Sequence, residues 1–192
     1  MNKVLLIASG MSAKEVHDYD YKANGWTIVA INNGWRVTED WDLWVRAGDF
    51  DGERPEVIKD TQEECKKYAD SLKHFGGHKE CGYSITLCAS YYSLWKYKPD
   101  VMGFLGCDMN YTPDADGNTH IYGVGSDIKK RGIPDPDRMV AQYAKGNENY
   151  LNDLYMRLVS EAESWSNCKV YNLSSVTDTR LPYNKAKPVD FQ

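Results

Sequence analysis

The residues best suited to chemistry are concentrated in one stretch, residues 99–122, which reads PDVMGFLGCDMNYTPDADGNTHIY. It begins with the short apolar run Val101–Leu105, which is typical of a buried parallel strand. Candidates for binding and catalysis follow the run: Gly106, Asp108, Tyr111, His120 and Tyr122. In open α/β sheets, ligands bind beyond the carboxyl ends of the strands. The stretch therefore suggests a ligand site, although a plain strand followed by a solvated loop has the same pattern.

The first apolar run of the chain also leads into polar residues. Val4–Ala8 predicts a strand, and Ser9 with Gly10 predicts a tight turn. Ser12 and Glu15 have the spacing of a capping box, which predicts the start of a helix. Backbone N–H groups at such a turn can bind an anion. Ser9, Gly10 and Ser12 are therefore candidates for cofactor binding, with a plain strand-to-helix connection as the alternative.

Two further predicted strands end in the same way. Thr27–Ile31 is followed by Asn32 and Asn33, whose amides can donate and accept hydrogen bonds. Leu43–Ala47 is followed by Asp49 within two residues. We expect these side chains to line one site with Ser9, Gly10, Asp108 and Ser84, the residue that begins a predicted helix.

The order of these segments predicts one α/β domain over residues 1–192. Short apolar runs alternate with longer amphipathic segments, which indicates a Rossmann-like three-layer α/β/α fold with a mainly parallel sheet. The last strand is expected at 169–173, and the helices at 12–21, 56–72, 84–95 and 137–164. The polar segment 112–136 contains glycines and prolines and is expected to act as a lid over the ligand.

Composition narrows the class of protein. The net charge of −5 and pI of about 5.4 give no basic field for a nucleic-acid backbone. No apolar run has the length of a membrane span, and Met1–Lys3 leads directly into the first predicted strand. Five cysteines without a CxxC motif indicate reduced thiols. We expect a cytoplasmic protein that could be oligomeric.

Two kinds of metal site are considered. The pairs Asp49-x-Asp51 and Asp114-x-Asp116 have the DxD form that can hold a divalent ion against a diphosphate. His74, His78 and Cys81 have spacings at which zinc can be bound, but no second close pair of ligands accompanies them. Neither pattern is preferred, so we expect no required metal.

Several segments in order resemble one family group, the sialyltransferase-like glycosyltransferases of bacteria together with the motility accessory factor proteins of flagellin glycosylation. The segments that carry the resemblance are VLLIASGMSAKEV, WTIVAINNGW, DLWVRAGDF, YSITLCASYYSLWKYKPDVMGFLGCDMNY and VYNLSSVTDTRLPY. The resemblance implies a nucleotide-sugar donor, for example a cytidine nucleotide sugar, and transfer to an acceptor hydroxyl without a metal ion.

The resemblance also implies residue roles. Gly10 and Ser12 would face the nucleotide phosphate, and Asn32 or Asn33 would contact the nucleotide. Ser84 would lie by the donor sugar, and Asp108 by the ribose or base. Further candidates are the phosphate partners Tyr111 and Tyr122, and Gly106 at the end of the strand. The chain departs from the sialyltransferases because their downstream histidine base has no counterpart.

His120 is the nearest substitute for that base, and it lies twelve residues beyond Asp108. His120 and Tyr122 have the same parity, so an extended segment would point both side chains toward the cleft. The leading hypothesis is a metal-independent, nucleotide-sugar-dependent glycosyltransferase. The alternatives are a non-catalytic protein that binds a nucleotide or small ligand, and a DxD metal-dependent transferase.

Overall fold

A six-stranded, all-parallel sheet forms the centre of the molecule, which confirms the predicted α/β Rossmann-like fold. The structure, a computed structural model, describes every residue except 57–58, 66, 76–80, 82–83, 111–112 and 124–149. The strands are β1 (Lys3–Ile7), β2 (Trp26–Ile31), β3 (Leu43–Val45), β4 (Glu63–Cys65), β5 (Val101–Leu105) and β6 (Lys169–Asn172). Their order in the sheet is β4-β3-β2-β1-β5-β6.

The strand order places a topological switch point between β1 and β5. From β1, the chain adds β2, β3 and β4 on one side and then returns to add β5 and β6 on the other. Ile7 at the end of β1 pairs with Ala30 of β2 and with Leu105 of β5, so these carboxyl ends lie level. Ligands of doubly wound sheets bind at this position.

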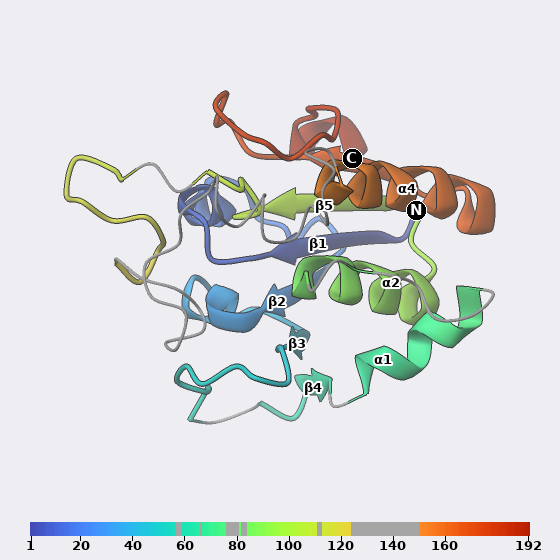
Figure 1. Cartoon of the computed structure of the whole chain (residues 1–192), viewed down its shortest axis with the longest axis horizontal. Helices are drawn as coiled ribbons and strands as arrows, with labels where there is room; N and C mark the ends of the chain where they lie inside the picture. Colours follow the sequence, from blue (N-terminus) through green and yellow to red (C-terminus); the bar gives the residue numbers. More distant parts are fainter. Residues whose placement is uncertain (57–58, 66, 76–80, 82–83, 111–112, 124–149) are drawn as a thin grey trace.

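One face of the sheet is covered by α-helices. They are α1 (Tyr68–Ser71), α2 (Ile85–Tyr97) and α4 (Tyr150–Ser166), and the short 3-10 helix η3 (Leu72–Phe75) continues α1. These helices lie together on one side of the sheet (Figure 1). Alternate strand residues such as Val4 and Leu6 belong to the hydrophobic cluster that packs against them. Burial of these apolar side chains is the main contribution that fixes the helices on the sheet.

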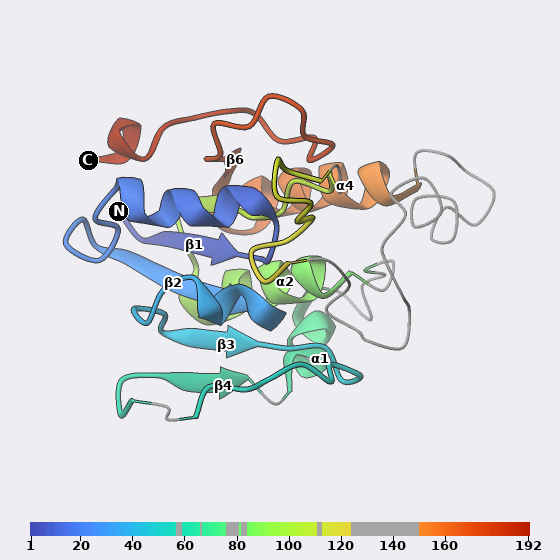
Figure 2. The same ribbon diagram turned by 90° about the vertical axis from the view of Figure 1, so that its left-hand side faces the viewer.

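The opposite face carries three 3-10 helices, of which only the first overlaps a predicted helix, that over 12–21. They are η1 (Met11–Asp18), η2 (Asn32–Arg36) and η5 (Pro188–Phe191). Leu5 and Ile7 point to this side, and the ring of Phe191 packs edge-on against Trp26. The C-terminal segment therefore completes the third layer, and Figure 2 shows it in red near the blue helix η1.

The predicted helix over 56–72 is wrong for most of its length. Residues Glu63–Cys65 form the edge strand β4, and α1 begins only at Tyr68. The glutamates of β4 pair with cations on neighbouring elements, Glu64 with Arg46 and Glu63 with Lys96, while Cys65 is buried. Charged residues and single apolar positions here fit a helical repeat, but pairing with β3 decides the conformation.

The other predicted elements are closer to the structure. β5 has the bounds predicted for it, and α2 begins one residue after Ser84, as expected. β3 ends at Val45, two residues before the predicted end. Within the predicted helix 137–164, α4 begins at Tyr150, and the earlier residues lie outside the described part of the chain.

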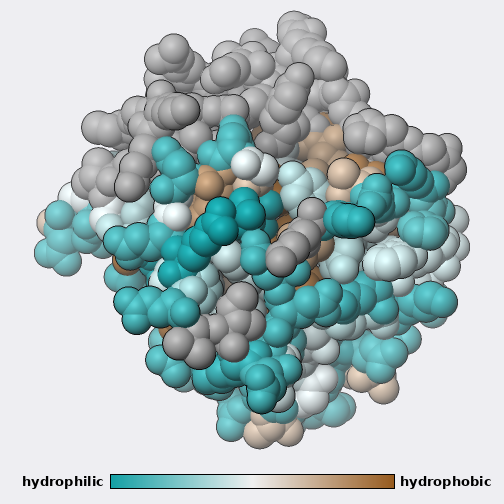
Figure 3. Space-filling view, turned by 90° about the horizontal axis from the view of Figure 1, so that it is seen from below, coloured by the Kyte–Doolittle hydropathy of each residue, from teal (hydrophilic) through white to brown (hydrophobic). Residues whose placement is uncertain are grey.

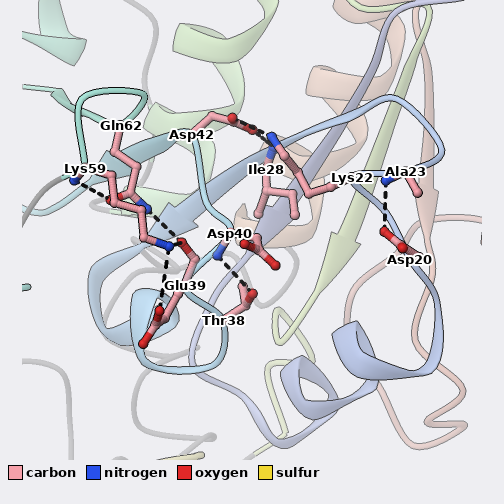
Figure 4. A network of polar contacts seen from close by, with 10 residues as sticks. All are labelled: Asp20, Lys22, Ala23, Ile28, Thr38, Glu39, Asp40, Asp42, Lys59 and Gln62. Carbon is pink, nitrogen blue, oxygen red and sulfur yellow. Dashed lines mark hydrogen bonds and ion pairs between the residues drawn. The ribbon is translucent and has the colours of Figure 1, made fainter.

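Polar contacts organise the amino ends of β2, β3 and β4 (Figure 4). Asp42, just before β3, accepts hydrogen bonds from the Ile28 N–H at 2.8 Å and from Lys22 Nζ at 2.6 Å. Nearby, Lys59 and Gln62 both donate to the Glu39 carbonyl. These contacts tie the loops before the strands together at the edge opposite the switch point.

The described surface is largely hydrophilic on the face seen in Figure 3, where hydrophobic residues show only in small areas. In the part of the chain that the structure describes, no helix combines the length and the apolar character needed to cross a bilayer.

Candidate functional site

Two loops are joined at the switch point by a chain of buried hydrogen bonds. Ser12 Oγ donates to Asp108 Oδ1 at 2.7 Å, and the Ser12 N–H donates to Asp108 Oδ2 at 3.2 Å. The Gly106 N–H in turn donates to Ser12 Oγ at 2.8 Å. We call Gly10, Ser12, Gly106 and Asp108 the clasp, because together they hold the end of β1 against the end of β5.

Two glycines allow the clasp to close. The Gly10 N–H donates to the Gly106 carbonyl at 2.8 Å, and a Cβ at Gly10 would lie 2.7 Å from that carbonyl oxygen. Gly106 has φ +67°, and a Cβ there would lie 2.4 Å from the Ala8 carbonyl oxygen. Such approaches are closer than carbon and oxygen tolerate, so glycine is required at both positions.

The clasp corrects the predicted capping box. Gly10, not Ser12, is the N-cap residue of η1, and it makes no side-chain cap. The Ser12 hydroxyl is used by Asp108 and Gly106. The N–H groups of Gly10, Ser12 and Ala13 donate to protein oxygens, so the predicted anion cradle is satisfied from within the chain.

A segment of the predicted lid is folded over the end of β1. The Ile121 N–H donates to the Ser9 carbonyl at 3.0 Å, and the His120 N–H donates to the Gly123 carbonyl at 3.1 Å. Residues 113–123 lie beyond the carboxyl ends of the strands, drawn in yellow in Figures 1 and 2. Tyr111, Thr112 and residues 124–136 of the predicted lid lie outside the described part of the chain.

His120 and Tyr122 do come together, but by a different geometry from the one predicted. Their rings stack with centroids 4.9 Å apart and an angle of 15° between planes. A tight turn that pairs His120 with Gly123 brings them together, where an extended segment was expected. His120 is 6% exposed, and its Nδ1 lies 3.0 Å from Thr119 Oγ1. Thr119 therefore orients the imidazole ring.

The two asparagines after β2 border the same edge of the sheet. Asn32 has φ 47°, its Oδ1 accepts from the Ala47 N–H at 2.9 Å, and its carbonyl accepts from Trp44 Nε1 at 2.7 Å. Asn32 thus fixes the end of β3, and Asn33 is also buried. A Cβ on Gly34 would lie 2.2 Å from the Ile7 carbonyl oxygen, so this turn packs directly on the end of β1.

The start of α2 lies on the other side of β5. Ser84, its N-cap, contacts the Tyr155 hydroxyl of α4 at 3.0 Å. Cys107 hydrogen bonds to Thr86 in the first turn of α2 and to the Ala8 backbone, which places that turn beside the ends of β1 and β5. Burial, and then the charge of Asp108, hold the pKa of the Cys107 thiol well above its ordinary value of 9.0.

Residues of the C-terminal segment complete the surroundings of Asp108. Its carbonyl accepts from the Arg180 N–H at 2.9 Å and from Thr179 Oγ1 at 3.1 Å. Lys185 Nζ donates to the Ser174 carbonyl at 2.6 Å, and burial lowers the pKa of Lys185, while the charges of Asp108 and Glu15 partly oppose that shift. Sequence reasoning assigned no role to these residues, although Ser174, Thr179 and Arg180 lie in the segment VYNLSSVTDTRLPY, because no local pattern shows that they approach Asp108.

The two DxD pairs lie in separate loops, and the Asp114 carboxylate is hydrogen-bonded within its own loop. Asp114 Oδ1 accepts from the N–H groups of Asp116 at 3.0 Å and Asn118 at 2.8 Å, and these bonds, with that of Asn118 first, lower the pKa of Asp114. Asp49 and Asp51 are exposed in the loop after β3. Among the residues described, no group of three or more His, Cys, Asp or Glu side chains is placed to hold a metal.

The structure describes two of the three proposed zinc ligands, His74 and Cys81, and each has a different neighbour. The His74 ring stacks on Trp95 with centroids 5.1 Å apart, and Cys81 contacts Cys88. His78 lies outside the described residues. The structure therefore does not bring His74 and Cys81 into a common ligand set in the part that it describes.

Comparison of the chain with family models, with curated proteins and with solved structures gave no match. The arguments for function therefore come from the sequence and from the geometry of this edge of the sheet.

Proposed function

We propose that this protein is a nucleotide-sugar-dependent glycosyltransferase of the sialyltransferase-like kind that requires no metal ion. The observation that carries the proposal is the hydrogen bond from the Ile121 N–H to the Ser9 carbonyl, which holds the turn with the stacked His120 and Tyr122 rings next to the residue that precedes Gly10 of the clasp. Doubly wound sheets bind nucleotides at the switch point, which here lies between β1 and β5. The order of motifs that resembles the sialyltransferase-like proteins supports the same class of donor.

Within this proposal, the residues of the clasp are positioning residues. Both carboxylate oxygens of Asp108 accept from Ser12, so Asp108 fixes the loops and does not need to contact the ribose. The nucleotide would lie over the ends of β1 and β2, bordered by Ser9 and Asn33. The donor sugar would extend toward the start of α2, where Ser84 and Tyr155 present hydroxyl groups.

The chemical step assigned to this site is direct transfer. His120 takes the proton of the acceptor hydroxyl as that oxygen bonds to the anomeric carbon of the sugar, and the bond from this carbon to the nucleotide phosphate breaks. In this proposal the Nδ1–H donates to Thr119 Oγ1, and the lone pair on Nε2 takes the proton. The Tyr122 hydroxyl would donate to the leaving phosphate.

The test is hydrolysis of cytidine and uridine nucleotide sugars without acceptor, measured by release of the nucleotide in the presence of EDTA. We expect turnover by the wild-type protein and a loss of about a hundredfold in His120→Gln with nucleotide affinity unchanged. Asp116→Asn is the matched control, since Asp116 is an exposed residue of the same loop. Equal turnover in wild type and His120→Gln would contradict the role of His120.

One observation favours a second candidate, a protein that binds a nucleotide without transferring a sugar. The side chains of Asp108 and Asn32 are both committed to structural hydrogen bonds. Tight nucleotide binding with no release from any nucleotide sugar would favour this candidate. A metal-dependent transferase is less well supported, because the Asp114 carboxylate accepts hydrogen bonds from its own loop; turnover abolished by EDTA would restore it.

A further inference from the structure

A pair of thiols lies where the chain enters α2. The side chains of Cys81 and Cys88 hydrogen bond to each other. The Ser84 N–H donates to the Cys81 carbonyl at 2.7 Å and the Cys88 N–H donates to the Ser84 carbonyl at 3.2 Å, so two successive turns bring both side chains to one side of the chain. Cys81 is 8% exposed, and Cys88 is partly exposed.

The other cysteines have different partners. Cys107 hydrogen bonds to Thr86, Cys65 to Tyr92, and Cys168 Sγ lies 3.7 Å from the Lys169 carbonyl. None of the five cysteines is in a disulfide in this structure. Contact between two cysteine side chains therefore distinguishes Cys81 and Cys88 within the described part of the chain.

The surroundings make the two thiols unequal. The Arg157 guanidinium of α4 lies close enough to Cys81 to interact with its charge, and a nearby cation favours the thiolate. The hydrogen bond to Cys81, and then burial, raise the pKa of Cys88 above its ordinary value. The cation beside Cys81 and the raised pKa of Cys88 therefore favour Cys81 as the attacking thiol.

We propose that Cys81 and Cys88 form a reversible disulfide, with Cys81 as the attacking and Cys88 as the resolving thiol. The oxidant is a low-molecular-weight disulfide. The Cys81 thiolate attacks one sulfur of this disulfide. A mixed disulfide forms between Cys81 and that half of the oxidant, and the other half leaves as a thiolate. Cys88 then loses its proton and attacks the Cys81 sulfur, which releases the second thiol. Two electrons pass from the protein to the oxidant.

Disulfide formation would have a local consequence. The two sulfurs, which are already in hydrogen-bond contact, would approach to about 2.05 Å. The new bond would tie Cys81 to the second turn of α2 across Ser84, whose hydroxyl contacts Tyr155. Oxidation would therefore fix the entry to α2 beside the candidate site, whether or not that site transfers a sugar.

The experiment equilibrates the native full chain in buffers of reduced and oxidised glutathione, followed by acid quenching, alkylation and tryptic mapping. Both thiols lie in one tryptic peptide, residues 80–96. We expect this peptide to become two hydrogens lighter and resistant to alkylation as the buffer becomes more oxidising. The same change in Cys168→Ala is the matched control. Alkylation of both thiols at every ratio would overturn the proposal.

Single variants test the order of attack. Cys88→Ser should keep a glutathione adduct on Cys81, whereas Cys81→Ser should accumulate much less adduct on Cys88. In the wild-type protein, Cys81 should react with iodoacetamide before Cys88, and Arg157→Gln should slow Cys81 by about threefold or more, while Arg157→Lys preserves its rate. An adduct that forms mainly on Cys88 would overturn the assigned order even if a variant is less stable, because the wild-type rates give the same information.

Discussion

Two aspartates tie loops to opposite edges of the sheet, and they do so in different surroundings. Asp42, at the amino edge, accepts from the Ile28 N–H and from Lys22, and the Lys22 and Asp42 side chains are 42% and 28% exposed (Figure 4). Asp108, at the carboxyl edge, is 5% exposed, and both its oxygens accept from Ser12. Water and the Lys22 cation compensate the charge of Asp42, whereas the Asp108 carboxylate accepts from a neutral amide and a hydroxyl of Ser12.

The difference supports the carboxyl edge as the place of the proposed ligand site. An exposed ion pair contributes little to stability and is screened by salt. A buried carboxylate loses its hydration and persists only where good hydrogen bonds compensate it. The clasp therefore fixes the loops at the β1–β5 switch point rigidly, and that is what a site needs from residues that position its walls. The amino-edge network needs only to hold loops in place.

The largest effect is expected from removing the buried carboxylate. Asp108→Ala leaves the Ser12 N–H and the Ser12 hydroxyl without their acceptor, so it should lower the free energy of unfolding by about 3 kcal/mol. Asp42→Ala should cost only about 1 kcal/mol, because water can replace its partners. Urea unfolding of the two variants measures both values. Equal losses would remove the distinction between the two edges.

A methyl group at the clasp tests how tightly its loops approach. Gly10→Ala should lower the free energy of unfolding by about 2 kcal/mol, because the Cβ would lie 2.7 Å from the Gly106 carbonyl oxygen. Gly48→Ala is the control, since nothing lies within 4 Å of its Cβ, and it should change stability by less than about 0.5 kcal/mol. Thermal unfolding of both variants suffices. A Gly10→Ala protein as stable as wild type would show that the clasp can open.

Alkaline pH should weaken the carboxyl edge through Cys107. Burial raises the pKa of Cys107 in the folded state. As the pH rises above the ordinary thiol pKa of 9.0, the unfolded chain therefore loses this proton before the folded protein does. The thiol's contribution is therefore fully present below pH 9 and falls by about 1.4 kcal/mol per pH unit above it. Urea unfolding at pH 8 and pH 10, with reductant, should show a smaller loss for Cys107→Ala than for wild type. Identical losses would contradict the burial of this thiol.

The smallest effect is expected at the amino edge. Lys22→Ala removes an exposed partner of Asp42 and should cost about 0.5 kcal/mol in low salt, and less as ionic strength rises. Ser12→Ala should also lower the free energy of unfolding, and salt should leave this loss nearly unchanged because the hydrogen-bond partners of Ser12 are buried. Unfolding curves at two salt concentrations compare them. A salt-dependent loss in Ser12→Ala would mean that water reaches the clasp.

Much of the sheet could be predicted from sequence, because apolar runs such as Val101–Leu105 are buried on both faces and bounded by turn residues. The edge strand β4 could not, because only Cys65 of its three residues is buried and its glutamates fit a helix as well as a strand. Its conformation is decided by pairing with β3, which no local pattern encodes.

The sequence predicted the position of the candidate site better than the contacts between its residues. Polar residues after β1, β2 and β5 indicated a common edge, and the parallel sheet places Ser9, Asn32 and Asp108 there. Local pattern assigned Ser12 to a helix cap, but a contact across 96 residues recruits it to Asp108. Lys185 was not predicted as a residue of the site for the same reason, since only the folded chain brings it near the Asp108 carboxylate.

The most direct test of the central claim is to map where a nucleotide binds by its effect on backbone amide resonances. Cytidine monophosphate would be titrated into the isotope-labelled protein. The account predicts shifts that cluster at Gly10, Ser12, Cys107 and Ile121, with the amides of Ile28 and Asp42 unchanged. Shifts confined to the Asp42 edge, or none with any cytidine or uridine nucleotide, would contradict a nucleotide site at the β1–β5 switch point.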